Sequence, residues 1–412
     1  MSSPATPDKP VVLVYAEPLL ARSMTFIRTQ AEALNSFSPY YISPRYESKG
    51  LPLPQERVVV MRRGQGGFSR LAVVPFKFFG LAPLFIRRLR KLRPVLLHAH
   101  FGFGGLRALP LARALGIPLA VTFQGCDATM HDEHLRKNSF YAARDYVRRR
   151  HILNEESTLL ISVSSFIRDE MIRQGFSANK IVVHYAGVDT ELFCPEPGVK
   201  RERIVLFAGR LDEKKGCEYL IRAMAKVQSQ YPEMELMVIG DGPLRADLEQ
   251  LAHQHLSNYR FLGFQPPETV RHWMNRARIF GAPSIRTPSG DAEGYPNAFA
   301  EAQAMKLPVV SFASDGVREA LVHNETGFLA PERDTETLAH YLSKLCGDEA
   351  LCIRMGEAAR QRVSKEFNLR TQTRKLEELY SRTLRNEISQ ERGYGKADGG
   401  FGERIAAVDA QG

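Results

Sequence analysis

Two α/β domains with doubly wound parallel sheets are predicted by three features of the sequence. Short apolar segments bounded by turn residues alternate with helical patterns, and this alternation restarts near residue 204. The segment 195–203 between the two series is polar and rich in helix-breaking residues, as expected of an interdomain linker. The length of 412 residues also suits two domains of ordinary size.

The chain divides into four predicted regions: an N-terminal domain (1–198), a C-terminal domain (199–370), a helix (371–388) and a disordered tail (389–412). In the first domain we expect strands at 10–16, 57–61, 94–100, 118–122, 159–163 and 181–184. In the second we expect strands at 204–208, 235–239, 260–262, 278–284 and 307–312. The intervening patterns predict helices that include 23–34, 106–115, 217–231, 297–305, 335–345 and 356–387.

The positive charge of the chain lies in its first half. Residues 1–198 carry 26 Lys and Arg against 16 Asp and Glu, whereas the remaining residues carry 30 of each. Within residues 57–126 there are 12 basic residues and no acidic residue. Such a field attracts phosphates on lipid, nucleic acid or an anionic substrate, and the alternative is a solvated face without function. Without a nucleic-acid-binding module, we expect no nucleic-acid partner.

A membrane-surface element is predicted over residues 68–93, where apolar bulk precedes a cluster of arginines. The alternative is a core helix with an exposed basic end. No apolar run is long enough to span a membrane, and residues 1–10 lack the apolar centre of a signal peptide. We therefore expect a cytoplasmic protein on the inner face of the membrane. The five scattered cysteines fit a reducing compartment and argue against a zinc site.

Two carboxylates surround the start of a predicted helix in the second domain. Pro296 opens this helix, Glu293 lies in the loop before it, and Glu301 lies one turn or so inside it. A helix N-terminus attracts anions, and carboxylates accept hydrogen bonds from hydroxyl groups. This pattern is typical of a site for a nucleotide sugar, which has a diphosphate between two hydroxyl-bearing groups.

A basic loop in the same half complements these carboxylates. Residues 209–216 place Arg210 and Lys215 between a strand and a helix, and both side chains suit a diphosphate. The loop is not a Walker A motif, so an ATPase is not indicated. In the first half, His98 and His100 end a predicted strand. We expect them to point to opposite faces, so that at most one reaches a site, and a glycine-rich turn at 102–105 is a weak phosphate-loop candidate.

These motifs together resemble the retaining glycosyltransferases of family 4. The resemblance rests on Gly-Arg-Leu-x-x-x-Lys-Gly at 209–216, Gly-Asp-Gly-Pro at 240–243 and Glu-Gly-x-Pro-x-x-x-x-Glu at 293–301. It covers residues 10–385 and implies a GT-B fold, in which two Rossmann-like domains face a cleft and the last helix crosses back to the first domain. It also implies a metal-independent reaction without a cofactor, in agreement with the absence of an Asp-x-Asp motif.

The resemblance assigns roles to individual residues. Arg210 and Lys215 would hold the diphosphate of a UDP- or GDP-sugar, Glu293 would contact the transferred sugar, and Glu301 would accept from the ribose. Further donor contacts fall on Gly240, Gly242, Gly294, Tyr295, Pro296 and Asn297. On the acceptor side, Ser23, Thr25, His98 and His100 resemble members that build exopolysaccharide or lipopolysaccharide. Those members use a lipid-linked or saccharide acceptor at an anionic membrane surface.

The sequence departs from the family at three positions. Gln124 stands where a histidine near the donor sugar is common, and Gln does not exchange a proton near neutral pH. Lys306 and Asp315 stand where glycine is usual, with local consequences expected. The sequence therefore predicts a retaining glycosyltransferase that moves a hexose in cell-surface polysaccharide biosynthesis, with Gln124 among the catalytic residues. The alternatives are a nucleotide-sugar epimerase and a catalytically weak nucleotide-sugar-binding protein.

Overall fold

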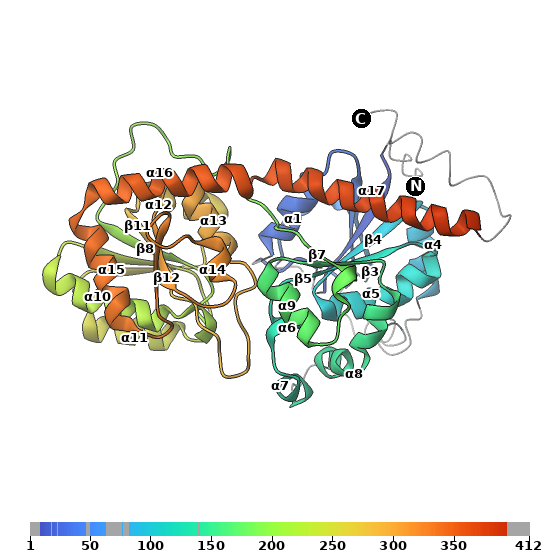
Figure 1. Ribbon diagram of the computed structural model, residues 1–412, viewed down its shortest axis with the longest axis horizontal. Coiled ribbons are helices and arrows are strands. Elements are labelled where there is room, and N and C mark those ends of the chain that lie inside the picture. Colours follow the sequence, from blue (N-terminus) through green and yellow to red (C-terminus); the bar gives the residue numbers. More distant parts are fainter. Residues whose placement is uncertain are drawn as a thin grey trace.

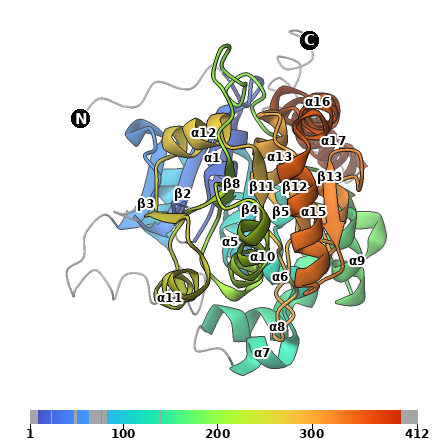
Figure 2. The same cartoon turned by 90° about the vertical axis from the view of Figure 1, so that its left-hand side faces the viewer.

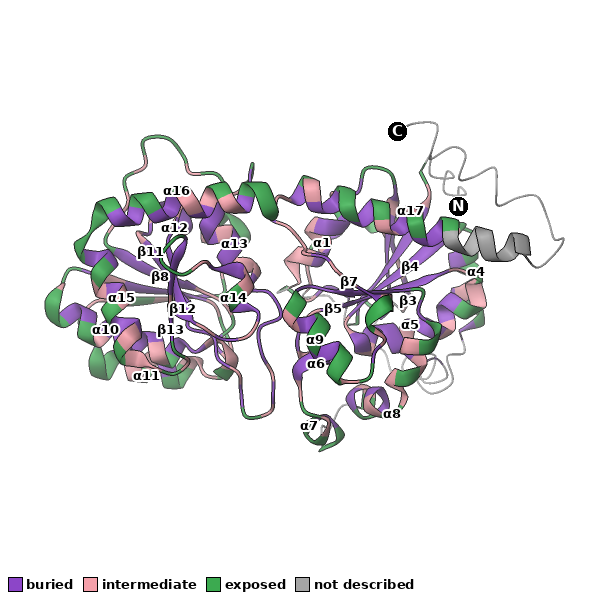
Figure 3. Ribbon diagram, viewed as in Figure 1, coloured by how far each residue is buried: buried purple, intermediate pink, exposed green. Residues whose placement is uncertain are grey.

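Two parallel β-sheets, each flanked by helices on both faces, form the molecule (Figure 1). The computed structural model describes residues 9–17, 19–22, 24–46, 50–62, 76, 82–137 and 141–393, without the side chains of 386–393. Buried residues line the strands and the helix faces turned toward them, while exposed residues lie on the outer helix faces (Figure 3). This arrangement confirms the predicted class of two doubly wound α/β units.

The N-terminal sheet has seven parallel strands in the order β3-β2-β1-β4-β5-β6-β7. Their bounds are β1 Val11–Tyr15, β2 Ser38–Arg45, β3 Val58–Arg62, β4 Pro94–His100, β5 Leu119–Phe123, β6 Leu159–Ser162 and β7 Ile181–Val183. The strand order reverses between β1 and β4. Ligands of open α/β sheets bind outside the carboxyl ends of strands at such a switch point.

The C-terminal sheet has six parallel strands in the order β10-β9-β8-β11-β12-β13. Their bounds are β8 Ile204–Ala208, β9 Glu235–Ile239, β10 Tyr259–Gly263, β11 Ile279–Gly281, β12 Val309–Phe312 and β13 Gly327–Ala330. Here the order reverses between β8 and β11, so the loops after these two strands are the expected ligand loops. They contain the Arg210–Lys215 segment and the Glu293 segment.

The helices cover both faces of each sheet (Figures 1 and 2). In the N-terminal unit they are α1 Thr25–Glu32, α4 Pro83–Arg90, α5 Gly102–Leu115, α6 Cys126–Thr129, α7 Asp132–Lys137, α8 Tyr141–Glu156 and α9 Ser165–Arg173. In the C-terminal unit they are α10 Cys217–Gln230, α11 Arg245–His255, α12 Pro267–Arg276, α13 Asn297–Ala304, α14 Val317–Ala320, α15 Thr335–Gly347 and α16 Glu349–Glu366. Helix α17, Leu369–Gly393, follows α16.

Helix α17 leaves the C-terminal unit and packs on the N-terminal sheet (Figure 1). Its buried Leu376, Tyr380 and Leu384 share an apolar cluster with Val12 and Leu96 of β1 and β4. The last helix therefore crosses back to the first sheet, as the family resemblance implies.

Several elements differ from the sequence-based expectations. Strand β2 was not predicted. It contains Pro39 and Pro44, and proline is uncommon in interior strands, yet it pairs with both β1 and β3. Strand β13 was also missed. The predicted helix 356–387 is two helices that meet at Phe367 and Asn368, where the chain makes a bridge to Val188. Helix α17 extends to Gly393, and residues 394–412 lie outside the described part.

The glycine-rich turn at 102–105 forms the first turn of α5. A Cβ on Gly105 would lie 2.7 Å from the Val121 side chain, and one on Gly102 would lie 2.7 Å from the ring of Tyr146. The glycines are therefore explained by close packing of α5 on its neighbours, whereas phosphate binding at this helix start stays a prediction.

Most of the predicted membrane-surface segment lies outside the described residues, which include only Phe76 and 82–93 of it. Helix α4 buries Phe85 and Leu89, while Leu84 is 77% exposed. The arginines Arg87, Arg88 and Arg90 occupy the last turn of α4, and Arg88 donates to the Val60 carbonyl. Among the described helices, none has the length and apolar character needed to cross a bilayer.

Candidate functional site

The two units meet through the loops at the carboxyl ends of β5 and β11. Gln124, Gly125 and α6 follow β5, and the segment 289–294 belongs to the loop between β11 and α13. The His131 N–H donates to the Ser289 carbonyl at 2.9 Å, and the Ala292 N–H donates to Thr129 Oγ1 at 3.2 Å. The fold thus brings Gln124 and Glu293, 169 positions apart in the numbering, to one interface.

Backbone contact at this interface requires glycine. A Cβ on Gly294 would lie 2.1 Å from the Gln124 carbonyl oxygen, and one on Gly316 would lie 2.1 Å from the Gly294 carbonyl oxygen. Both distances are far below contact distance for real side chains. The backbone after Glu293 is therefore held between the N-terminal unit and the start of α14.

Lys215 and Glu293 form a partly buried ion pair, with 2.7 Å between Lys215 Nζ and Glu293 Oε1. The Glu293 side chain is only 8% exposed. Burial by itself raises the pKa of Glu293, but the charges of Lys215 and Lys214 outweigh it and hold that pKa below its ordinary value. Glu293 is therefore a carboxylate at neutral pH, ready to accept hydrogen bonds from hydroxyl groups.

A second ion pair lies beside the first and was not anticipated from the sequence. Lys214 Nζ is 3.1 Å from Asp291 Oδ1, and both side chains are partly buried. The Ile285 N–H donates to the Lys214 carbonyl at 2.8 Å, which fixes this loop against the chain after β11. The sequence contained only one signal for this pair: Lys214 is next to Lys215, and Asp291 lies two residues before Glu293.

Arg210 lies at the exposed edge of the same loop. Its side chain is 64% exposed, and its Nε lies 3.3 Å from Asp212 Oδ2. Asp212 also caps the short 3₁₀ turn Glu213–Lys215 by accepting from the Lys215 N–H. Arg210 and Lys215 are thus on one loop, with Arg210 exposed enough to reach an anionic group.

Gly240 and Gly242 support this loop from behind. A Cβ on Gly240 would lie 1.8 Å from the Gly209 carbonyl oxygen, and one on Gly242 would lie 2.3 Å from the Leu211 carbonyl oxygen. The Leu211 N–H donates to the Asp241 carbonyl at 3.0 Å. The packing gives both glycines a role in shaping the Arg210 loop, whereas a contact with a donor remains a prediction.

Glu301 lies in the second turn of α13, and Asn297 begins this helix after Pro296. Burial raises the pKa of Glu301 to about 7, so that the carboxyl is partly protonated near neutral pH. Tyr295, in contrast, packs its ring against Tyr185 and Phe367 in the interior, at centroid distances of 5.2 Å to each. A donor contact by Tyr295 would therefore come from its backbone.

His98 and His100 lie on the same face of β4, with ring centroids 4.4 Å apart. The expectation of opposite faces is wrong, because residues two positions apart on a strand share a face. His98 is held on both sides: Nδ1 lies 2.6 Å from Tyr380 Oη and Nε2 lies 2.7 Å from Thr122 Oγ1. His98 is thus a buried partner of α17, in line with the expectation that one of the two belongs to the core.

His100 contacts the site wall. Its Nδ1 lies 3.2 Å from Gln124 Nε2, and burial lowers the pKa of His100 to about 3. A neutral His100 accepts a hydrogen bond from the Gln124 amide at this distance. Of the other acceptor-side residues, Thr25 begins α1 and is half-buried, while Ser23 lies outside the described residues.

Asp127 organises this wall and was missed by the sequence analysis. Its fully buried carboxylate accepts three backbone N–H groups, from Gly102 at 2.7 Å, Gly125 at 2.9 Å and Gln124 at 3.1 Å. It thereby ties the loop after β4 to the loop after β5. The available signal was the position of Asp127 two residues after Gly125. Aspartate is favoured in turns, where it can accept from nearby backbone N–H groups.

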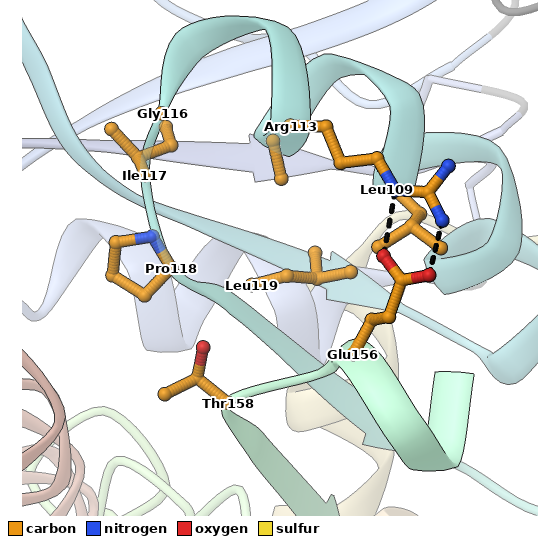
Figure 4. Close-up of a pocket in the computed structure, with 9 residues that line it drawn as sticks. Leu109, Arg113, Gly116, Ile117, Pro118, Leu119, Glu156 and Thr158 are labelled. Carbon is orange, nitrogen blue, oxygen red and sulfur yellow. Dashed lines mark hydrogen bonds and ion pairs between the residues drawn. The ribbon is translucent and has the colours of Figure 1, made fainter. Parts of the chain in front are cut away.

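A pocket of about 270 Å³ lies elsewhere, between the end of α5 and the end of α8 (Figure 4). Arg113 and Glu156 pair across it through two hydrogen bonds. Pro118 and Leu119 line it at the amino end of β5, whereas Gln124 follows the carboxyl end. The pocket is therefore separate from the interface site. No cluster of three or more metal-binding side chains occurs within the described ranges.

Comparisons with known proteins match both halves of the chain to glycosyltransferase families. Residues 39–192 match the model described as Glycosyltransferase Family 4, and residues 190–362 match Glycosyl transferases group 1. The amylovoran biosynthesis glycosyltransferase AmsK of Erwinia amylovora is 34% identical over 292 residues, which is 69% of each chain. The putative colanic acid biosynthesis glycosyltransferase WcaL of Escherichia coli K12 is 30% identical over 292 residues, covering 68% of this chain and 69% of WcaL.

Solved structures show the same fold. The Anabaena protein HepE in complex with UDP has a TM-score of 0.69 and 19% identity, and the match covers 90% of this chain and 99% of HepE. Together with the two parallel sheets and the crossing α17, this likeness confirms the GT-B fold. The chain therefore belongs to the GT-B glycosyltransferases, with a family 4 amino-terminal region, a group 1 carboxy-terminal region, and AmsK and WcaL among its relatives.

Proposed function

We propose that the protein is a retaining hexosyltransferase that moves a sugar from a UDP- or GDP-sugar to a lipid-linked or saccharide acceptor in exopolysaccharide synthesis. The ion pair between Lys215 and the buried Glu293, at the junction of the two units, carries this proposal. A carboxylate held ionised there accepts from sugar hydroxyls, and a lysine beside it compensates charge on a departing diphosphate. The roles of AmsK in amylovoran biosynthesis and of WcaL, putatively, in colanic acid biosynthesis support the polysaccharide class.

The donor is held by the C-terminal unit. Arg210 and Lys215 bind the diphosphate, and the N–H groups at the start of α13 face its negative charge. Glu301 accepts hydrogen bonds from the ribose hydroxyls, which places the transferred sugar toward Glu293. The two basic side chains supply the charge that a divalent cation supplies in other transferases, so the reaction is metal-independent. The UDP bound to HepE makes UDP-sugars the first donors to test.

The acceptor approaches from the N-terminal unit, where Gln124 and His100 line the wall. Neither exchanges a proton at neutral pH, since Gln124 is an amide and burial keeps His100 neutral. The departing phosphate itself therefore takes the acceptor proton on the face where the new bond forms, which retains the anomeric configuration. An acceptor carried on a lipid diphosphate brings the enzyme to the inner face of the membrane, where the basic first half meets anionic lipid.

Sugar transfer by wild-type protein and by Lys215→Ala and Glu293→Ala variants tests this function. Wild type is incubated with UDP- and GDP-hexoses and a lipid-linked saccharide, with the product anomer read by NMR. Each variant should transfer at least ~100-fold more slowly, because charge stabilisation or sugar contact is lost. Lys226→Ala is the matched control, since Lys226 pairs with Glu336 on the surface, away from the interface.

Four results would contradict the proposal. Unchanged turnover in both variants removes the site from the reaction, and an inverted product anomer removes the retaining mechanism. Conversion of the nucleotide sugar without any acceptor identifies an epimerase instead. Tight nucleotide binding without transfer to any acceptor identifies a binding protein, in which Gln124 has replaced a catalytic group.

A further inference from the structure

Asp315 forms a two-pronged ion pair with Arg286. Arg286 Nε lies 3.0 Å from Asp315 Oδ2, and Arg286 Nη2 lies 3.0 Å from Asp315 Oδ1. The backbone of Asp315 has a φ of 31°, which glycine adopts more readily than aspartate. The carboxylate therefore compensates an unfavourable backbone with a contact that glycine is unable to make.

The same guanidinium reaches across to the N-terminal unit. Arg286 Nη2 lies 2.7 Å from Glu170 Oε1 on α9, and the guanidinium also lies over the ring of Phe166 on that helix. Glu170 is 8% exposed, so its charge is shielded from water and needs a cationic partner. Its other oxygen accepts from Arg173 at 2.7 Å. Arg286 thus joins a buried carboxylate of one unit to a carboxylate of the other.

The residues next to Arg286 and Asp315 both hydrogen-bond to the segment that carries Glu293. Gly316, next to Asp315, donates its N–H to the Glu293 carbonyl at 3.2 Å. Thr287, next to Arg286, donates its N–H to the Asp291 carbonyl at 3.0 Å. A shift of Arg286 is therefore transmitted to the backbone on both sides of Glu293.

A second contact fastens the same helix. Glu319 of α14 accepts from the Ser165 and Phe166 N–H groups at the start of α9, at 3.0 and 2.7 Å, and from Tyr185 Oη at 2.8 Å. Helix α9 is therefore held by the C-terminal unit at its first turn and again at Glu170. These two attachments orient α9 relative to the loop of Glu293.

We propose that Arg286 is a positioning residue for sugar transfer, and that Glu170, Arg286 and Asp315 form an interdomain clasp. The clasp rests on the proposed function: the donor lies on the C-terminal unit, and transfer needs the wall at Gln124 brought against it. Holding α9 to the Glu293 segment keeps the two walls together. Cutting the clasp lowers the fraction of molecules with both walls in place and leaves nucleotide binding to the C-terminal unit intact.

Two single variants each weaken one of the two ion pairs of Arg286, which are the two limbs of the clasp. Glu170→Gln removes the charge attraction between the units, and Asp315→Gly removes the contact within the C-terminal unit. Each should lower kcat/KM for transfer about tenfold, while the Kd for UDP or GDP changes less than twofold. The double variant should also lose about tenfold and not a hundredfold, because both limbs act through Arg286.

Lys306→Gly is the matched control. Lys306 also has a positive φ, 58°, but it pairs with Glu357 within the C-terminal unit. This variant should transfer sugar at the wild-type rate. Small-angle X-ray scattering provides a readout without catalysis: the radius of gyration should increase in Glu170→Gln and Asp315→Gly and stay unchanged in Lys306→Gly.

The outcomes separate the clasp from the proposed function. The clasp is overturned if Glu170→Gln matches wild type in transfer and scattering, even when Asp315→Gly is impaired, because the limb between the units is then without effect. Losses that multiply in the double variant overturn it as well. Wild type that transfers no sugar defeats the proposed function alone, and scattering then still decides for or against the clasp.

Discussion

The ionisation of Glu293 is the decisive property at the scale of single residues. A carboxylate this well buried would ordinarily become protonated, but two neighbouring lysines keep its pKa below the ordinary value. Glu301, eight positions on, has no such neighbours, and burial alone raises its pKa to about 7. The two carboxylates of one motif are thereby set to different protonation states near neutral pH.

The pH dependence of donor binding should reveal Glu301. Between pH 6 and pH 8 the carboxyl passes from mostly protonated to mostly ionised, because its pKa is about 7. Since the ionised form accepts two hydroxyl hydrogen bonds, affinity for a nucleotide sugar should rise several-fold across this interval. Calorimetric titration at pH 6, 7 and 8 measures the change. A nucleotide sugar is used because its diphosphate diester does not titrate in this range.

Glu301→Gln is the control for this effect. The amide does not titrate, so its affinity should be the same at all three pH values. Glu301→Gln should also remove a pH dependence of stability. In wild type the raised pKa of Glu301 makes the folded protein bind a proton that the unfolded chain has released, so the free energy of unfolding falls as pH rises from about 4.5 to 7. An equally steep affinity profile in Glu301→Gln would assign the titration to another group.

At the scale of elements, α17 ties the two units together by polar as well as apolar contacts. Glu377 accepts from the Asn35 and Ser36 N–H groups at 2.7 and 2.6 Å, at the end of α1. His184 Nε2 lies 2.8 Å from the Gln372 carbonyl, and His98 binds Tyr380. A helix that begins beside one unit and is buried on the other links the two units along one side, and the clasp acts at the site.

Tyr380 should be the strongest anchor of α17. Its ring is 1% exposed and packs edge-on against Phe37 at a centroid distance of 5.4 Å. Tyr380→Ala removes this packing and leaves His98 without its partner, so unfolding should become easier by about 3–5 kcal/mol. Tyr380→Phe removes only the hydroxyl and should cost about 1–2 kcal/mol. Urea unfolding of the three proteins measures both differences.

Glu378→Ala provides the comparison on the same helix. Glu378 points away from the sheet, with a side chain 61% exposed and 3.9 Å from Arg374. Its loss should change stability by no more than about 0.5 kcal/mol. If Tyr380→Ala were as mild as Glu378→Ala, the docking of α17 would contribute little to the stability of the N-terminal unit.

At the scale of the whole molecule, backbone contact between the units determines the site. Gly294 lies against the Gln124 carbonyl, and a Cβ on Gly125 would lie 3.3 Å from the Ala292 carbonyl oxygen. Polar side chains, including the Arg286 clasp, surround this contact. The units therefore meet where the segment that carries Glu293 packs against the turn that carries Gln124. These two segments are the two walls of the site.

Gly294→Ala should separate the two walls without unfolding either unit. The added methyl would lie 2.1 Å from the Gln124 carbonyl oxygen, which belongs to rigid backbone, so one unit must move. Sugar transfer should fall at least ~100-fold, because a displacement of about 1 Å at reacting groups has that effect. A transfer assay and far-ultraviolet circular dichroism measure activity and fold together.

Gly116→Ala serves as the matched substitution. Gly116 ends α5 with a φ of 67°, and no atom lies within 4 Å of an added Cβ. Its cost should be backbone strain of about 1 kcal/mol, with transfer unchanged. Equal transfer by Gly294→Ala and Gly116→Ala would show that the observed contact is not required in the catalytic arrangement.

Local patterns in the sequence were sufficient for the α/β class and for the loops that carry Arg210, Lys215 and Glu293. Apolar strands and helix signals act over a few neighbouring residues, so the sequence displays them directly. Strand β2 was missed, and it contains two prolines although it pairs with a strand on each side, so the tertiary structure overrides the local preference. The face shared by His98 and His100 also follows from local geometry, and the expectation of opposite faces misapplied that rule.

Contacts between distant segments were decided by the tertiary structure. Nothing near Asp315 in the sequence indicates Glu170, and nothing near Tyr380 indicates His98, because each pair forms only when separate elements pack together. The same applies to the protonation states of Glu293 and Glu301, which depend on burial and on lysines from another loop. The sequence by itself determined the fold class and the chemical groups of the site. Packing alone decided their spacing and charge, since both arise from through-space interactions between residues remote along the chain.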